Sequence, residues 1–264
     1  MSRQFTAGTR LRGVDTLGGD PPVLFVNGGL STQRQWKRVI TRLDGRYRTV
    51  TYDARGRGSS GTSTDHSLRG AVDDVDRVVE ATALGQPILV GWSHGATIAL
   101  CYAAEYPERV SGLVLIDGVH PVSVLDDMGR ERVRRQCRGR GRSSRLPSVL
   151  APGVRLGSQD RAELVIETDE VNGDLGIGWE ALRCPTVLVV PASDTAGAAA
   201  VDAVASDDSV TFLVTTTTDR ARILTEDPDV VAAAIEEVRR RRMPDPDFLA
   251  PTAPLKLASP SRSS

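Results

Sequence analysis

Short runs of β-branched and other apolar residues alternate along this chain with longer stretches in which apolar residues recur every three or four positions. The first pattern predicts buried strands and the second predicts amphipathic helices. We expect a small opening hairpin at 4–16, then strands at 22–26, 49–53, 88–92, 113–117, 186–190 and 210–214. Helices are expected after Ser31 and at 67–83, 96–106 and 228–240. This alternation is typical of an α/β fold, a doubly wound and mostly parallel sheet with helices on both faces.

Two regions interrupt the alternation. Residues 120–183 separate two expected strands by more than a simple crossover requires, which predicts a helical lid insertion. Residues 243–264 are rich in Pro, Ser and Ala, and we expect them to form a disordered tail. The sequence therefore predicts one domain, 1–242, that carries the insertion.

The most informative segment is Gly91-Trp92-Ser93-His94-Gly95, which lies between an expected strand and an expected helix. A G-x-S-x-G motif in this context is a nucleophile elbow, a sharp turn that holds the serine at its tip. Gly91 and Gly95 lack the Cβ atoms that would collide with the neighbouring strand and helix. The positive end of the helix dipole then points at Ser93 and favours negative charge there.

Three motifs in this order resemble the α/β-hydrolase superfamily over roughly residues 20–240. The first is Asn27-Gly28-Gly29-Leu30, where the family has His-Gly-x-x; the second is DARGRGSS at 53–60, similar to D-x-R-G-x-G-x-S; the third is the elbow. The later segment CPTVLVVPASDTAG looks like the strand and loop that carry the family's catalytic acid, which would be Asp194. The resemblance implies the α/β-hydrolase fold and acyl transfer through Ser93.

The resemblance also implies roles for the neighbouring residues. Backbone N–H groups of Gly29 and His94 would stabilise the oxyanion that forms when Ser93 attacks an acyl carbon. Asn27 in place of histidine should matter little, because the donors are backbone amides. In the DARGRGSS loop we expect Asp53 and Arg55 to hold loops together. The full expected set for the oxyanion hole and the substrate is Asn27, Gly28, Gly29, Trp92, His94 and Asp117.

The pattern departs from the family at the catalytic histidine. In the family this residue precedes the last helix, but residues 215–231 contain none, and the spacing points to Arg220 or Ala221. The chain has only His66, His94 and His120. His120 lies three residues after Asp117 at a strand end, where a displaced Asp117–His120 pair could serve Ser93. Asp194 would then be either the acid of this site or an ion-pair partner of Arg220 or Arg222.

Three functions stay open at this point. The first is hydrolysis of an ester, thioester or lactone through Ser93, with His120 as a displaced base. The second is a non-hydrolytic acyltransferase, cyclase or lyase of small-molecule biosynthesis on the same scaffold. The third is a catalytically silent member that binds a ligand or partner. Loss of one triad member typically leaves about 10³–10⁴-fold catalysis over water, so an incomplete triad does not exclude an enzyme.

The segment 130–145, RERVRRQCRGRGRSSR, contains eight arginines and one glutamate. Like charges repel, which favours a solvated and extended segment. The alternative is an anion-recruiting patch at the mouth of the site. Arginine suits carboxylates and phosphates, including the phosphopantetheine arm of a carrier protein or of coenzyme A. The expected partner is a small-molecule substrate, presented in this alternative as such a thioester.

Composition and charge remove other classes of partner. With 33 Lys and Arg against 34 Asp and Glu, the net charge of −1 argues against nucleic acid. No apolar run reaches the roughly 18 residues of a membrane span, and the first residues do not resemble a signal peptide. Cys101, Cys137 and Cys184 are expected to be free thiols in a cytoplasmic protein. No metal or cofactor motif is present.

Overall fold

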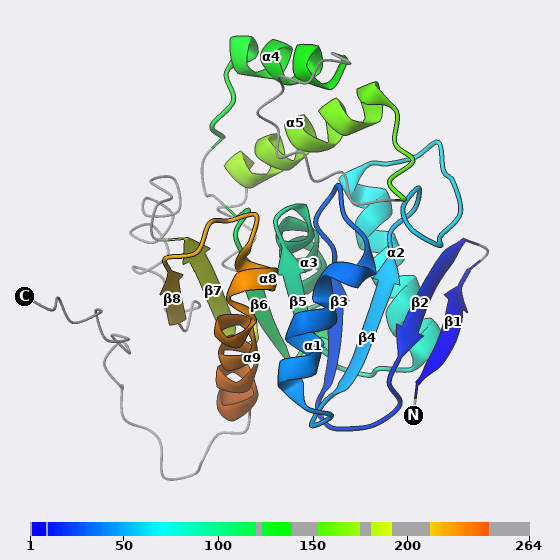
Figure 1. Ribbon diagram of the computed structural model, residues 1–264, viewed down its shortest axis with the longest axis vertical. Helices are drawn as coiled ribbons and strands as arrows, with labels where there is room; N and C mark the ends of the chain where they lie inside the picture. Colours follow the sequence, from blue (N-terminus) through cyan, green and yellow to red (C-terminus); the bar gives the residue numbers. More distant parts are fainter. Residues whose placement is uncertain are drawn as a thin grey trace, which may run out of the picture.

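The computed structural model describes residues 2–8, 10–119, 123–138, 153–174, 181–191 and 212–242. Within them the chain forms one eight-stranded sheet in the order β1-β2-β4-β3-β5-β6-β7-β8 (Figure 1). The strands are β1 (Arg3–Ala7), β2 (Leu11–Asp15), β3 (Pro22–Val26), β4 (Arg48–Asp53), β5 (Ile88–Trp92), β6 (Gly112–Ile116), β7 (Thr186–Pro191) and β8 (Phe212–Thr216).

The sheet is antiparallel at one edge and parallel elsewhere. β1 pairs with β2 and β2 with β4 in antiparallel fashion, whereas every pairing from β4 to β8 is parallel. The order reverses between β3 and β5, because the chain adds β4 on one side of β3 and then crosses to the other side. Ligand sites of open α/β sheets lie at such a switch point, beyond the carboxyl ends of the strands. Val26 of β3 lies beside Gly91 of β5 there, which brings the first motif next to the elbow.

Alternation along each parallel strand divides the core into two layers. In β5, Leu89 joins one apolar cluster, while Ile88 and Val90 join the other. Burial on both faces explains why these strands read as continuous apolar runs. One layer is covered by α1 (Lys37–Leu43) and α9 (Pro228–Arg242), and the other by α2 (Leu68–Thr82) and α3 (His94–Glu105). The short elements are η1 (Gln33–Trp36), η2 (Pro107–Arg109) and α8 (Ile223–Glu226).

The ends of α2 illustrate how sequence sets local structure. Ser67 is its N-cap, and the Ser67 hydroxyl oxygen accepts a hydrogen bond from the Gly70 N–H at 3.1 Å. The helix ends where Ala83 adopts a left-handed conformation with φ of 50°. Between these ends, Val72, Val75 and their apolar neighbours one turn on face the sheet. The predicted helix at 67–83 is therefore confirmed.

Two helices, α4 (Asp127–Arg138) and α5 (Ser158–Asp174), belong to the predicted insertion 120–183. Val133 of α4 is buried against Ala162 and Ile166 of α5. Figure 1 shows both helices beyond the carboxyl ends of the strands, with α5 between α4 and the sheet. The sequence favoured an extended conformation for the arginine-rich segment, and this is wrong for 130–138. Burial of Val133 supports helix there, and residues 139–145 lie outside the described part of the chain.

The other strand predictions match the structure closely. The hairpin at 4–16 is present as β1 and β2, and the five strands from 22–26 to 186–190 agree to within one residue. β8 overlaps the predicted strand 210–214 from residue 212 on, and residues 210 and 211 lie outside the described part. The predicted tail at 243–264 also lies outside it. No helix among the described residues is long and apolar enough to cross a membrane.

Candidate active site

Ser93 has the backbone conformation that the elbow prediction requires. Its φ of 54° and ψ of −126° are costly for a residue with a side chain, and such outliers persist only where surrounding contacts fix them. The flanking glycines explain how the turn is possible. A Cβ on Gly91 would lie 2.3 Å from the Gly95 carbonyl oxygen, and one on Gly95 would lie 2.3 Å from the Val26 carbonyl oxygen. The strand–serine–helix prediction is therefore confirmed as a conformation.

The end of β6 holds the Ser93 backbone in place. The Ser93 N–H donates to the carbonyl oxygens of Ile116, at 2.9 Å, and Asp117, at 2.7 Å. Gly118 follows with φ of 116°, and a Cβ on it would lie 2.6 Å from Ser93 Cα. Because β6 contacts the elbow this closely, Asp117 lies next to the nucleophile position, as its place in the sequence predicted.

Gly29 and His94, the two expected oxyanion donors, also lie together. A Cβ on Gly29 would be 3.3 Å from His94 Cβ, so the two backbones approach closely. Gly28 packs against the Trp92 indole, where a Cβ would lie 2.6 Å from Cε3. The His94 N–H belongs to the first residue of α3 and has no acceptor within the helix. The backbones of the two expected donors are therefore neighbours in the structure.

Asn27 has a structural function in this arrangement. Its side-chain amide donates to the Tyr52 carbonyl oxygen at 2.6 Å, and its carbonyl oxygen accepts from the Trp36 indole N–H at 2.8 Å. Asn27 is 5% exposed. It therefore ties the end of β3 to β4 and to η1, which fixes the start of the Gly28-Gly29 turn.

The His94 imidazole is buried and contacts α5. Its Nδ1 lies 2.7 Å from Thr168 Oγ1, and the Thr168 hydroxyl in turn donates to the Leu164 carbonyl oxygen at 2.5 Å. Because the hydroxyl proton is used there, Nδ1 must carry the proton of the imidazole and donate it. Burial, followed by the nearby Arg57 charge, lowers the pKa of His94 to about 3. A general base at neutral pH needs a pKa near 7, so this ring is not one.

One face of α5 covers the elbow. Its residues Leu164, Thr168 and Asn172 are spaced four apart and so lie on the same side of the helix. Leu164 packs on Gly29, and the buried Asn172 donates to the Gly118 carbonyl oxygen at 2.6 Å while it accepts from the Thr97 hydroxyl at 3.0 Å. The helix α5 therefore contacts Gly29, His94 and Gly118 directly.

Arg220 lies where the family spacing points to a histidine, and it pairs with Asp117. Its Nε donates to Asp117 Oδ2 at 3.0 Å, and the carboxylate is only 3% exposed. The Arg220 carbonyl oxygen accepts from the Trp92 indole N–H at 3.3 Å. Arg222, the other cation expected to replace the histidine, pairs with Glu226 instead. Since arginine stays protonated at any physiological pH, Arg220 cannot accept the serine proton.

The DARGRGSS loop has the structural role that its sequence indicated. Asp53 accepts hydrogen bonds from the Gln33 and Ser59 backbone N–H groups at 2.9 and 2.8 Å. Arg55 forms a bidentate pair with Asp74, with both distances 2.7 Å, and a second pair with Asp65. The loop is thereby joined to η1 and α2.

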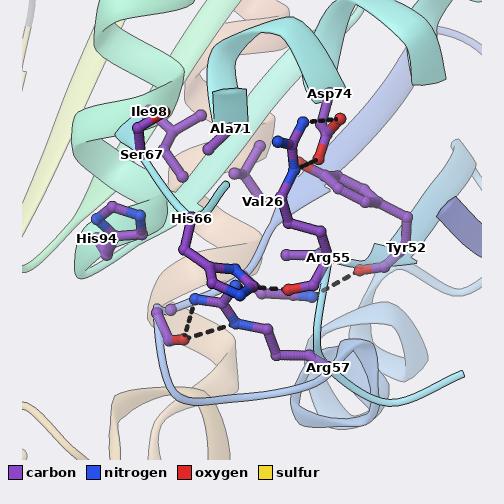
Figure 2. A pocket seen from close by; sticks show the side chains of 14 residues that line it. Val26, Tyr52, Arg55, Arg57, His66, Ser67, Ala71, Asp74, His94 and Ile98 are labelled. Atoms are coloured by element: carbon purple, nitrogen blue, oxygen red, sulfur yellow. Dashed lines mark hydrogen bonds and ion pairs between the residues drawn. The ribbon is translucent and has the colours of Figure 1, made fainter. Parts of the chain in front are cut away.

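Two of the predicted catalytic residues, His120 and Asp194, lie outside the described residues. Their roles stay predictions. His66 faces a small cavity that also borders Gly29, Arg57 and His94 (Figure 2). Burial lowers the pKa of His66, and the Arg57 charge adds to this effect. No cluster of three metal-ligating side chains occurs in the described ranges.

Comparison with known proteins agrees with this fold. The sequence model of the family described as alpha/beta hydrolase fold matches residues 21–136. The chain has the α/β-hydrolase fold. Its structure aligns with the enol-lactonase from Burkholderia xenovorans LB400 at a TM-score of 0.70 and 14% identity, covering 89% of this chain and 99% of that one. It also aligns with E-2-(acetamidomethylene)succinate hydrolase at a TM-score of 0.67 and 20% identity, covering 90% and 98%.

A curated relative of this hydrolase-fold protein is 2-(acetamidomethylene)succinate hydrolase from Mesorhizobium japonicum. It is 33% identical over 118 residues, which is 44% of this chain and 42% of the relative. The aligned stretch therefore spans less than half of the relative's length. Several relatives are hydrolases, while another, from Kluyveromyces marxianus, is named ethanol acetyltransferase 1.

Sequence reasoning missed three parts of the candidate site. It did not identify the α5 face, the Arg57 contact with Gly29 or the Asp117–Arg220 pair. The four-residue spacing of Leu164, Thr168 and Asn172 predicts a shared helix face but not what this face covers. Arg57 occupies a variable position of its motif, so the motif assigns it no role.

Proposed function

We propose that this protein is a serine-type acyl-transfer enzyme that hydrolyses an ester, thioester or lactone through Ser93. The observation that carries the proposal is the strained Ser93 backbone, held by the end of β6 beside the amides of Gly29 and His94. Strain of this kind is retained at functional sites, whereas an incidental serine in a turn would not require it.

In the proposed reaction Ser93 Oγ forms a bond to the acyl carbon while its proton passes to a base. The negative charge on the carbonyl oxygen is stabilised by the Gly29 and His94 N–H groups. The intermediate collapses, the bond to the leaving oxygen or sulfur breaks, and the leaving group takes up the proton. Water then attacks the acyl-enzyme by the same steps and restores Ser93. His120 stays our proposed base, with Asp117 as its neighbour.

A fluorophosphonate probe tests this proposal directly, because it modifies a serine only when the site activates it. We expect labelling of the wild-type chain on the peptide that contains Ser93, and complete loss in Ser93→Ala. Ser111→Ala is a matched control, since Ser111 precedes β6 at the opposite end of the sheet and should label like wild type. Wild-type protein that stays unlabelled at high probe concentration refutes the proposal.

The Asp117–Arg220 pair favours a second candidate function, a non-hydrolytic acyltransferase, cyclase or lyase. A permanently charged residue occupies the region where the family has its proton acceptor, so the pocket and the oxyanion hole would provide most of the catalysis. Turnover that survives Ser93→Ala would favour this candidate. A protein that binds an apolar ligand tightly without labelling or turnover would instead be a silent binding member.

For the substrate we propose an acyl thioester carried on a phosphopantetheine arm, attracted by the arginines of α4. Arg130, Arg134 and Arg138 pair with carboxylates, whereas Arg132 and Arg135 are exposed and have no ion pair in the described ranges. The kcat/KM for hydrolysis of acetyl-coenzyme A should therefore fall steeply as the salt concentration rises. The kcat/KM for the uncharged acetyl-pantetheine should not. Equal salt dependence of the two would contradict this assignment.

A further inference from the structure

Arg57 is a buried cation that forms no ion pair with any carboxylate among the described residues. The residue is 4% exposed, and no carboxylate in the described part of the chain pairs with it, whereas Arg55 in the same loop pairs with two. Burial lowers the pKa of Arg57 to about 10, so the guanidinium is still charged at neutral pH. A buried charge without an ion-pair partner is costly, so the hydrogen bonds that Arg57 makes are informative.

The contacts of Arg57 lead to Gly29. Its Nε and Nη2 both donate to the Gly29 carbonyl oxygen, at 3.0 and 2.8 Å, and its Nη1 donates to the Arg55 carbonyl oxygen at 2.6 Å (Figure 2). Gly29 lies 28 positions earlier in the sequence. Arg155, in contrast, donates to the carbonyl oxygens of Gly58 and Ser60 and so braces the loop itself. The Arg57 fork therefore connects the loop to the proposed oxyanion hole.

The two peptide groups on either side of the Gly29 Cα are held by hydrogen bonds from other residues. The Gly28 carbonyl oxygen accepts from the Ser31 N–H at 3.1 Å and from the Ser31 hydroxyl at 2.8 Å. In a trans peptide the N–H points opposite to the C=O, so this contact turns the Gly29 N–H away from Ser31. The next carbonyl, that of Gly29, is held by Arg57. Since glycine has little conformational preference, the direction of its N–H depends on these two contacts.

We propose that Arg57 is a positioning residue of the oxyanion hole, which aligns the Gly29 peptide and places a buried positive charge behind it. The inference rests on the proposed function of Ser93. The charge favours an oxyanion at the hole, because a buried cation is weakly screened and its position does not change during the reaction. Arg57 itself does not need to touch the substrate.

The test compares Arg57→Gln and Arg57→Lys with wild type, using Arg155→Gln as the matched control. Two quantities are measured: the rate of inactivation by a fluorophosphonate, and kcat and KM for p-nitrophenyl butyrate. A misplaced donor should lower kcat and the inactivation rate by about 10–100-fold in Arg57→Gln and leave KM within about threefold. Arg57→Lys keeps the charge but loses the fork, so it should fall between the two. Arg155→Gln should match wild type.

Circular dichroism and thermal unfolding establish which variants are folded. If neither Arg57 variant folds, Ser31→Ala tests the same geometry from the other peptide, with the same expected loss in kcat. A folded Arg57→Gln that reacts as fast as wild type, or that changes only KM, overturns the inference and leaves the proposed function intact. Wild-type protein that takes no label overturns the proposed function, and with it the inference.

Discussion

The His94 imidazole makes the stability of this protein depend on pH in a specific way. The ring is 6% exposed and donates its Nδ1 proton to Thr168. Its native pKa is about 3, against 6.5 for the unperturbed group, because burial and the Arg57 charge both oppose protonation. The native state therefore keeps His94 neutral at every pH at which the protein would be handled.

The size of the effect follows from proton linkage. Between pH 6.5 and pH 3 the unfolded chain binds a proton at this position and the native chain does not. Stability is therefore lost as the pH falls below 6.5, and the loss continues until the pH nears 3. With about 1.36 kcal/mol for each unit, His94 should lower the free energy of unfolding by about 2 kcal/mol at pH 5 relative to pH 7.

Urea unfolding of wild type and His94→Asn at pH 7, 6 and 5 measures this contribution. Asparagine keeps an N–H donor for Thr168 but does not titrate, so the variant should lose about 2 kcal/mol less between pH 7 and pH 5. Carboxylates that titrate in this range contribute equally to both proteins and cancel in the comparison. His66→Asn is the control, since His66 is only partly buried and its effect should be smaller. Parallel losses in wild type and His94→Asn would refute the reasoning.

Three further changes test contacts around the elbow. Gly118→Ala should lower the thermal unfolding temperature far more than Gly85→Ala, because both have positive φ but only Gly118 lacks space for a Cβ. Asn172→Leu leaves the Gly118 carbonyl without its amide donor, so it should cost about 2 kcal/mol by urea unfolding and speed hydrogen exchange in α5. Arg220→Gln should cost more than Asp117→Asn, roughly 2 against under 1 kcal/mol, because it leaves the buried carboxylate charged while Asp117→Asn leaves the exposed guanidinium in water. Equal effects of the two glycine variants, or of Arg220→Gln and Asp117→Asn, would contradict the contact assigned there. An Asn172→Leu variant as stable as wild type would contradict the Asn172 contact.

The sheet could be predicted from the sequence because its strands are buried on both faces. Leu89 contacts one apolar layer, and Ile88 and Val90 contact the other, so the strand has no polar face and stands out as an apolar run. The elbow could also be predicted from the sequence. A Cβ atom at Gly91 or Gly95 would collide with the neighbouring backbone, so only glycine fits these two positions. These features depend on local steric requirements, which a sequence states directly.

The partners of charged side chains could not be predicted in the same way. Arg55 and Arg57 are two positions apart in one loop, yet Arg55 binds carboxylates and Arg57 binds a peptide carbonyl oxygen. The position of Arg220 was predicted from spacing, but its described partner, Asp117, is 103 residues away. Contacts of this kind depend on the packing of distant elements, and a residue type alone does not determine them.

Arg220 makes the pH dependence of catalysis informative. If His120 accepts the Ser93 proton, kcat/KM should rise with pH and level off once the imidazole is deprotonated. If no imidazole acts, the proposed oxyanion hole would still favour negative charge at the site, but the proton must leave to solvent. The rate should then keep rising with hydroxide concentration, with no plateau between pH 7 and pH 9. His120→Gln separates the two cases, because it should convert the first profile into the second. A plateau that survives His120→Gln would show that a group other than His120 accepts the Ser93 proton.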